Sequence, residues 1–95
     1  MKGARWLFAD PPNCAVFSVR DIVFRDRPIL FVSHDDDGDW QFLTGERVRE
    51  KDATVVSLGE IVELDTTLLE LADLPSGWIA TRPSANSSWK RKARQ

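Results

Sequence analysis

His34 and Cys14 are the residues of this 95-residue sequence whose chemistry comes closest to that of a catalytic pair. Histidine is the usual general base of enzymes, and a cysteine activated by a base is a strong nucleophile. Each is the single residue of its type, which excludes a local zinc motif. Cys14 lies in an apolar segment, where a free cysteine behaves as a small hydrophobic residue. We therefore expect no catalytic site and no cofactor, and a Cys14–His34 dyad is the enzymatic alternative.

An acidic cluster occupies residues 35–39. Its carboxylates are those of Asp35, Asp36, Asp37 and Asp39. Hard cations prefer several carboxylate oxygens, but an EF-hand loop with Gly38 at its sixth position would begin at Ser33 and end at Thr44, where acids are required. We therefore expect no metal site here and interpret the four aspartates as partner-binding candidates at a solvated hairpin tip.

The acidic cluster begins a strongly negative stretch of the chain. Residues 35–73 contain twelve acidic and three basic residues, a net charge of −9, whereas the formal net charge of the whole chain is −2. A negative surface attracts a basic partner and speeds its encounter. The sequence thus favours an unidentified protein partner, for which a basic toxin that acts on nucleic acid is one example.

The C-terminal residues have the opposite charge. An aromatic residue and four cations occur together: Trp89, Lys90, Arg91, Lys92 and Arg94. Such a mixture can contact a nucleic-acid backbone and stack on a base, so a small nucleic-acid-associated protein is the alternative function. The segment can equally pair with the acidic body of the chain. We expect residues 90–95 to form a basic C-terminal tail that follows a domain at 1–89 with an ordered core at about 14–83.

The length and composition fit one small globular domain. A single cysteine cannot form an intramolecular disulfide, which favours a reducing compartment. No apolar run approaches the roughly 18 residues of a membrane span. We therefore expect a cytoplasmic protein that does not act at a membrane.

Propensity and turn signals predict an α+β fold. The Asp-Gly pair at 37–38 predicts a hairpin over residues 29–44, and Ser57 with Glu60 matches a capping box at a helix start. The other expected elements are strands at 14–19, 53–56 and 78–82 and short helices at 58–64 and 66–72. Residues 21–27 fit either a strand or a helical turn.

These elements predict an antiparallel sheet of four to five strands with one or two short helices packed on one face. The expected core residues are Phe17, Phe31, Phe42, Trp78, Leu68, Leu69 and Leu71. Unpaired edge strands invite strand addition, so a homodimer stays open, with Pro28 and Pro83 as candidates for edge protection.

Three segments, at residues 38–45, 56–62 and 71–78, resemble a family of short bacterial proteins of unknown function later grouped with predicted immunity proteins of polymorphic toxin systems. The resemblance covers about residues 14–90. The residues that carry it are Trp40, Phe42, Gly45, Leu74, Pro75 and Gly77. It implies a stoichiometric protein inhibitor or a stand-alone relative of one, in which these six residues are structural.

Overall fold

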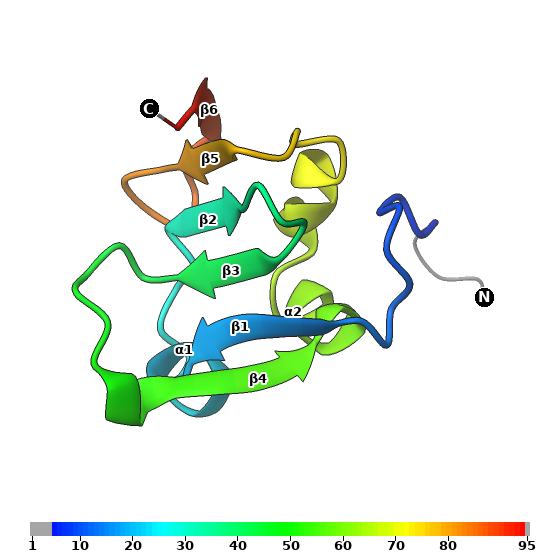
Figure 1. Ribbon diagram of the computed structural model, residues 1–95. Helices are drawn as coiled ribbons and strands as arrows, with labels where there is room; N and C mark the ends of the chain where they lie inside the picture. The colour runs from blue at the N-terminus through cyan, green and yellow to red at the C-terminus, as the bar shows by residue number, and fades with distance from the viewer. Residues whose placement is uncertain (1–4, 95) are drawn as a thin grey trace.

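The computed structural model describes residues 5–94, which form one mixed β-sheet with short helical segments packed on it (Figure 1). The strands are β1 (Ala15–Val19), β2 (Phe31–His34), β3 (Trp40–Leu43), β4 (Ala53–Ser57), β5 (Trp78–Thr81) and β6 (Lys90–Ala93). The helical segments are α1 (Arg20–Arg25), α2 (Leu58–Leu64) and the 3-10 helices η1 (Glu50–Asp52) and η2 (Thr66–Leu71). The α+β class is confirmed. The predicted number of strands was too low, because the described residues form six.

The strand order is β4-β1-β3-β2-β5-β6. All neighbouring strands are antiparallel except β1 and β3, which run parallel with Phe17 opposite Gln41. A parallel pair needs a crossover connection, and here the chain passes through α1 and β2 before β3 returns to the side of β1. The sheet is therefore mixed, whereas the sequence predicted an antiparallel one.

The predicted hairpin is confirmed as β2 and β3, with His34 opposite Trp40. Its turn closes through two backbone hydrogen bonds, from Asp35 N to Asp39 O at 2.8 Å and from Gly38 N to Asp35 O at 2.9 Å. Gly38 has a φ of 93°, a left-handed conformation that glycine adopts without steric cost. The Asp-Gly signal therefore placed this turn correctly.

The capping box at Ser57 is also confirmed. Ser57 Oγ accepts from Glu60 N at 3.1 Å, and Glu60 Oε1 accepts from Ser57 N at 3.1 Å. Asp65 then ends α2 and caps η2, because its Oδ1 accepts from Thr67 N at 3.0 Å. The two short helices thus follow from two successive caps, although the second one is a 3-10 helix.

Most of residues 21–27, which fitted either a strand or a helical turn, lies in α1, which ends at Arg25. Arg25 and Asp21 pair at 2.5 Å across one helical turn, and Ile22 is buried against the sheet. Asp26 ends the helix with a φ of 57°. The ion pair on the exposed side of α1 and the burial of Ile22 on its other side therefore stabilise a helix rather than a strand in this segment.

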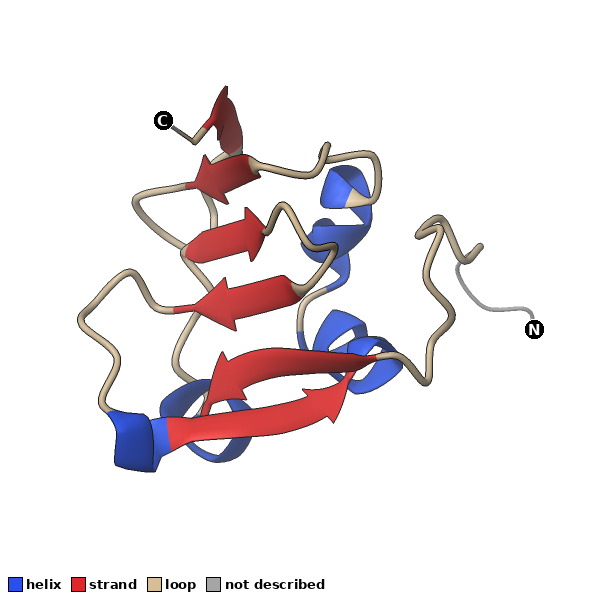
Figure 2. Cartoon of the chain, in the orientation of Figure 1, coloured by secondary structure: helices blue, strands red, loops and turns tan. Residues whose placement is uncertain are grey.

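The core lies between the sheet and α1, α2 and η2, which cover one side of it (Figure 2). β3 shows the alternation of a pleated sheet most clearly, because Trp40 and Phe42 are buried whereas Gln41 and Leu43 are partly buried. The most deeply buried apolar residues of the strands and helices are Val16, Val32, Phe42, Ala80, Leu58, Ile61, Leu68 and Leu71.

The core prediction was wrong for Phe17. Its side chain is 45% exposed, because Val16 and Ser18 occupy the inward positions of β1 and place Phe17 on the uncovered side of the sheet. Val55, directly opposite Phe17 on β4, is also exposed there. Of the other predicted core residues, Phe42, Leu68 and Leu71 are buried, and Leu69 and Trp78 are partly buried and pack against the core. Phe31 is partly buried but is not part of the core cluster, so this prediction was wrong as well.

The ordered region extends beyond residues 14–83 at both ends. Phe8 is 5% exposed within the core. Residues 90–93, which were expected in a tail, form β6 and pair with β5, with Thr81 opposite Lys90. The edge strands are therefore β4 and β6, whereas Pro28 and Pro83 flank the interior strands β2 and β5, so these prolines do not protect an edge.

Candidate functional site

The four predicted partner-binding aspartates form the turn between β2 and β3, which we call the acidic turn (residues 35–39). Asp35 differs from the others because its carboxylate is partly buried and fully engaged. It accepts hydrogen bonds from Ser33 Oγ at 2.5 Å and Gln41 Nε2 at 2.7 Å, and it pairs with Arg94 Nη1 at 3.3 Å. Asp35 thus anchors the turn to the sheet.

These contacts also set the ionisation of Asp35. Partial burial alone would raise its pKa, but the hydrogen bonds from Ser33 and Gln41 and the positive charge of Arg94 outweigh burial and lower the pKa below its ordinary value. Asp35 is therefore a stable carboxylate at neutral pH, with its charge neutralised from within the molecule.

The other three acids of the turn, Asp36, Asp37 and Asp39, are exposed. Among the described residues, none of them takes part in an ion pair. Asp37 Oδ1 accepts from Asp39 N at 3.1 Å, which adds to the backbone bonds that close the turn. The structure therefore divides the predicted cluster into one anchor and three carboxylates that face solvent.

The acidic turn rests on the start of β5 through Gly77. Gly77 N donates to His34 O at 2.7 Å, and Gly77 has a φ of 82°. A side chain at this position would approach Asp36 Oδ1 to 2.6 Å. Gly77 thus supplies both the backbone geometry and the space that the turn needs.

The remaining residues of the family resemblance lie on β3, beyond its end and in the segment before β5. Trp40 stacks on His34 with ring centroids 3.9 Å apart and on Phe42 at 5.9 Å, and Trp40 Nε1 donates to Asp10 Oδ2 at 3.1 Å. Leu74 is buried, and Pro75 O accepts from Trp78 N at 3.2 Å. Gly45 has a φ of 92° beyond the end of β3.

His34 is held by its neighbours rather than directed at a nucleophile. Its Nδ1 donates to Leu74 O at 2.7 Å, because a carbonyl oxygen can only accept. Burial and the negative charges of Asp10 and Asp39 raise the pKa of Cys14, which disfavours the reactive thiolate. The geometry and the electrostatics therefore give no support to the Cys14–His34 alternative.

The cations of the nucleic-acid alternative are exposed on or beside β6, but two of them have internal partners. Arg91 pairs with Asp73 at 3.0 Å, and Arg94 pairs with Asp35. Lys90 and Lys92 take part in none of the ion pairs found within residues 5–94. The basic segment and the acidic body therefore meet inside one molecule.

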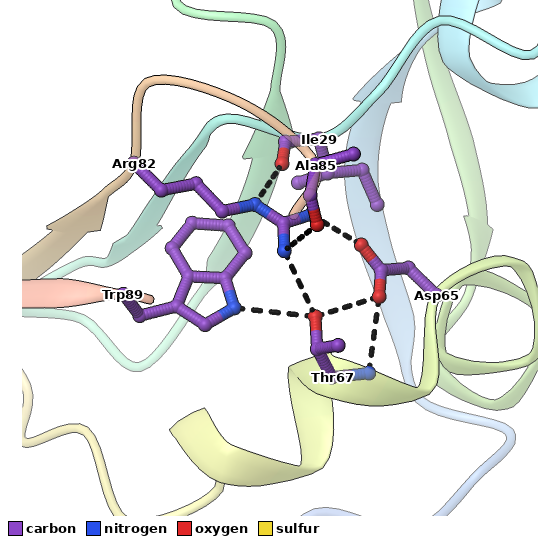
Figure 3. Close-up of polar contacts among 6 residues, drawn as sticks. All are labelled: Ile29, Asp65, Thr67, Arg82, Ala85 and Trp89. Atoms are coloured by element: carbon purple, nitrogen blue, oxygen red, sulfur yellow. Dashed lines mark hydrogen bonds and ion pairs between the residues drawn. The ribbon is translucent and has the colours of Figure 1, made fainter. Parts of the chain in front are cut away.

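Trp89 is engaged as well, through a buried arginine that the sequence did not reveal (Figure 3). The guanidinium of Arg82 lies 4.1 Å from the ring centroid of Trp89, whose Nε1 donates to Thr67 Oγ1 at 3.3 Å. The Arg82 side chain is 1% exposed and forms an ion pair with Asp65. Trp89 thus belongs to an internal cluster and is not free to stack on a base.

Arg82 connects segments that are distant in the sequence. Its Nε donates to Ile29 O at 3.0 Å, and its Nη1 donates to Thr67 Oγ1 and Ala85 O, each at 3.1 Å (Figure 3). Together with Asp65 at Nη2, these acceptors give each of the three guanidinium nitrogens a hydrogen-bond partner. We interpret Arg82 as the anchor that fixes η2 and the β5–β6 connection to the sheet.

No protein-family model, curated protein or solved structure matches this chain. Residues 5–94 contain no group of three or more histidine, cysteine or acidic side chains arranged to hold a metal ion. None of the helices in this described region has the length and apolar character needed to cross a membrane.

Proposed function

We propose that this protein is a non-catalytic protein-binding module that engages a basic partner through the exposed carboxylates of the acidic turn, Asp36, Asp37 and Asp39. The observation that carries the proposal is that these three charges face solvent on a turn whose backbone is fixed by internal hydrogen bonds. A preorganised charge cluster loses little conformational freedom on binding, and it steers an oppositely charged partner toward itself.

The mode of action that fits this surface is inhibition or regulation by occlusion. Proteins that act on nucleic acid present basic surfaces to its phosphates, and an acidic turn is complementary to such a surface. The resemblance of residues 38–45, 56–62 and 71–78 to predicted immunity proteins supports the same mode of action, because it implies a stoichiometric protein inhibitor. With the acidic turn as the contact surface, a basic toxin is the partner that fits.

The proposal is tested on a partner identified by affinity capture with the full chain and mass spectrometry. We expect the Asp36→Asn/Asp37→Asn/Asp39→Asn variant to associate about tenfold more slowly at low salt and with a weaker salt dependence. A matched control, Glu50→Gln/Glu63→Gln/Glu70→Gln, removes three exposed acids elsewhere and changes the net charge equally.

The control variant should retain most of the wild-type association rate. Wild-type affinity and salt dependence in the turn variant would refute the proposal. Equal losses in the two variants would assign the effect to net charge and would equally refute a role for the turn.

The alternative, a nucleic-acid-associated protein, now depends on Lys90 and Lys92, because Trp89, Arg91 and Arg94 have internal partners. Two exposed cations give a weaker phosphate-binding surface than the five-residue segment that the sequence suggested. The protein-binding proposal is therefore the one that the geometry favours.

A further inference from the structure

β6 is an edge strand whose side chains contribute nothing to the core. All four of its residues are exposed. It is held by backbone pairing with β5 and by the exposed ion pair Arg91–Asp73. Arg94, just after the strand, adds an ion pair with the partly buried Asp35 and a hydrogen bond to Ser33 Oγ at 3.3 Å. Exposed ion pairs stabilise a structure only slightly and weaken with salt. Among the strands of the sheet, β6 is thus the one held by the fewest buried contacts.

The contacts of β6 show which backbone groups of β5 would be available to another strand if β6 were displaced. Arg94 N donates to Gly77 O at 2.8 Å, and Ile79 lies opposite Lys92. By the alternation of antiparallel pairing, Ile79 and Thr81 direct their N–H and C=O groups toward β6. Gly77 adds only its C=O, because its N–H donates to His34 O on β2. The edge of β5 therefore offers a backbone ladder to an extended segment.

Carboxylates flank this ladder on both faces of the sheet. Arg91 lies opposite Ala80, which points into the core, so its partner Asp73 lies on the helical side. Arg94 reaches Asp35 on the other side. Two arginines three residues apart on a strand at this edge therefore reach one acid on each face of the sheet, as Arg91 and Arg94 do.

The opposite edge of the sheet, at β4, is less suited to strand addition. Ala53 already donates its N–H to Glu50 O, and Ser57 donates its N–H to Glu60 Oε1 at 3.1 Å. Local caps thus occupy donors along β4, whereas the edge of β5 is covered only by an exposed strand.

We propose that the edge of β5 is a binding site for an extended basic segment of a partner protein, and that β6 occupies this site in cis until the partner segment displaces it. The recognised pattern is that of β6 and its flanks: an aromatic residue, an arginine two residues later and a second arginine three residues after that. The mode is β-strand addition, in which the backbone gives affinity and the side chains give specificity. This inference rests on the proposed function, because it requires a basic partner.

Displacement is a competition with a tethered ligand. A segment joined by the short connection at residues 82–89 has an effective concentration on the order of mM. A partner overcomes this advantage when it also contacts the nearby acidic turn, since linked contacts add avidity. Weakening the anchors of β6 should therefore open the site to a free peptide.

The test uses the full chain and a fluorescent peptide with the sequence of residues 87–95. We expect the Arg91→Ala/Arg94→Ala variant to bind this peptide at least tenfold more tightly than the wild type does, by fluorescence anisotropy at low salt. The Lys90→Ala/Lys92→Ala variant is the matched control, because it removes two charges from the same segment but no ion pair. It should bind the peptide as the wild type does.

Two further arms locate the bound peptide. Adding Asp35→Asn and Asp73→Asn to the Arg91→Ala/Arg94→Ala variant should abolish binding, as should alanines at the two arginine positions of the peptide. NMR shifts on peptide addition should be largest for the amides of β5.

Equal peptide binding by all variants, binding that survives loss of both aspartates, or no binding at all would overturn the proposal. Dimerisation of the arginine variant would also overturn it, because it would assign the edge of β5 to strand exchange between copies. The peptide assay does not involve Asp36, Asp37 or Asp39, so its failure is distinguishable from failure of the proposed function.

Discussion

Arg94 Nη1 lies 3.3 Å from Asp35 Oδ1 and so joins the basic end of the chain to the base of the acidic turn. This contact explains why the two candidate sites of the sequence are not independent. One carboxylate of the predicted acidic site and one cation of the predicted basic site neutralise each other. The charges left to face solvent are those of Asp36, Asp37 and Asp39 on one side and of Lys90 and Lys92 on the other.

Asp35 makes stability depend on pH in the acid range. Its lowered pKa adds stability above the ordinary aspartate pKa of about 4, and this contribution is lost as the pH falls through the lowered value. We expect Asp35→Asn to be about 1 kcal/mol less stable than the wild type at pH 7 by urea denaturation, and we expect this difference to shrink as the pH falls through the lowered pKa.

Asp36→Asn is the matched control for Asp35, because Asp36 lies on the same turn but is exposed. Its effect on the free energy of unfolding should stay within about 0.5 kcal/mol. A pH-independent difference between Asp35→Asn and the wild type would contradict the role given to the Asp35 charge.

Removing the buried guanidinium of Arg82 should be the most damaging single change among these predictions. Arg82→Met leaves the partly buried carboxylate of Asp65 and the carbonyls of Ile29 and Ala85 without their donor. We expect a loss of about 3 kcal/mol in the free energy of unfolding. Arg82→Lys should restore little of it, because an ammonium group cannot reproduce the planar fork.

Arg25→Met provides the comparison for Arg82. Arg25 pairs with Asp21 on the surface of α1, where both side chains are exposed. Its loss should change stability by about 0.5 kcal/mol or less. Similar effects at the two positions would show that Arg82 is not the anchor inferred here.

Alanine substitutions at Gly77 and Gly45 distinguish the effect of backbone strain from the effect of local crowding. Both have positive φ, so alanine at either position should cost about 1 kcal/mol. A side chain at Gly45 meets open space, whereas one at Gly77 displaces the Asp36 carboxylate. We expect similar thermal destabilisation from Gly77→Ala and Gly45→Ala, but altered NMR shifts at Asp36 and weaker partner binding only from Gly77→Ala.

Polyanion chromatography checks the nucleic-acid alternative. Because Arg91 and Arg94 are neutralised internally, we expect weak retention of the full chain at low salt and the same elution for Lys90→Ala/Lys92→Ala. Strong retention that these two substitutions remove would favour nucleic-acid binding over the protein-binding proposal.

The parts of the fold that follow from the sequence are those whose causes are local. The turn at Gly38 depends on an Asp-Gly pair, and the start of α2 depends on Ser57 and Glu60, which are three residues apart. In each case the residues that stabilise the element are near neighbours in the chain, so a short window of sequence is enough to predict it.

The parts that could not be predicted depend on distant partners. Arg82 finds its acceptors at positions as remote as Ile29 and Asp65, and nothing in the residues around it signals burial. β6 consists of charged residues and a terminal alanine, which read as a tail until the edge of β5 and the carboxylates of Asp35 and Asp73 are placed beside it.

The position of β1 between β3 and β4 has a consequence for the nascent chain. β1 is synthesised before both of its neighbours in the sheet, β3 and β4, and β4 ends at Ser57. Synthesis proceeds from the N-terminus at roughly 5 to 20 residues per second, so β4, which ends 38 residues after β1, is complete about 2 to 8 seconds after β1. During that interval its apolar side chains are open to chaperones, and the sheet closes around β1 only when more than half of the chain is available.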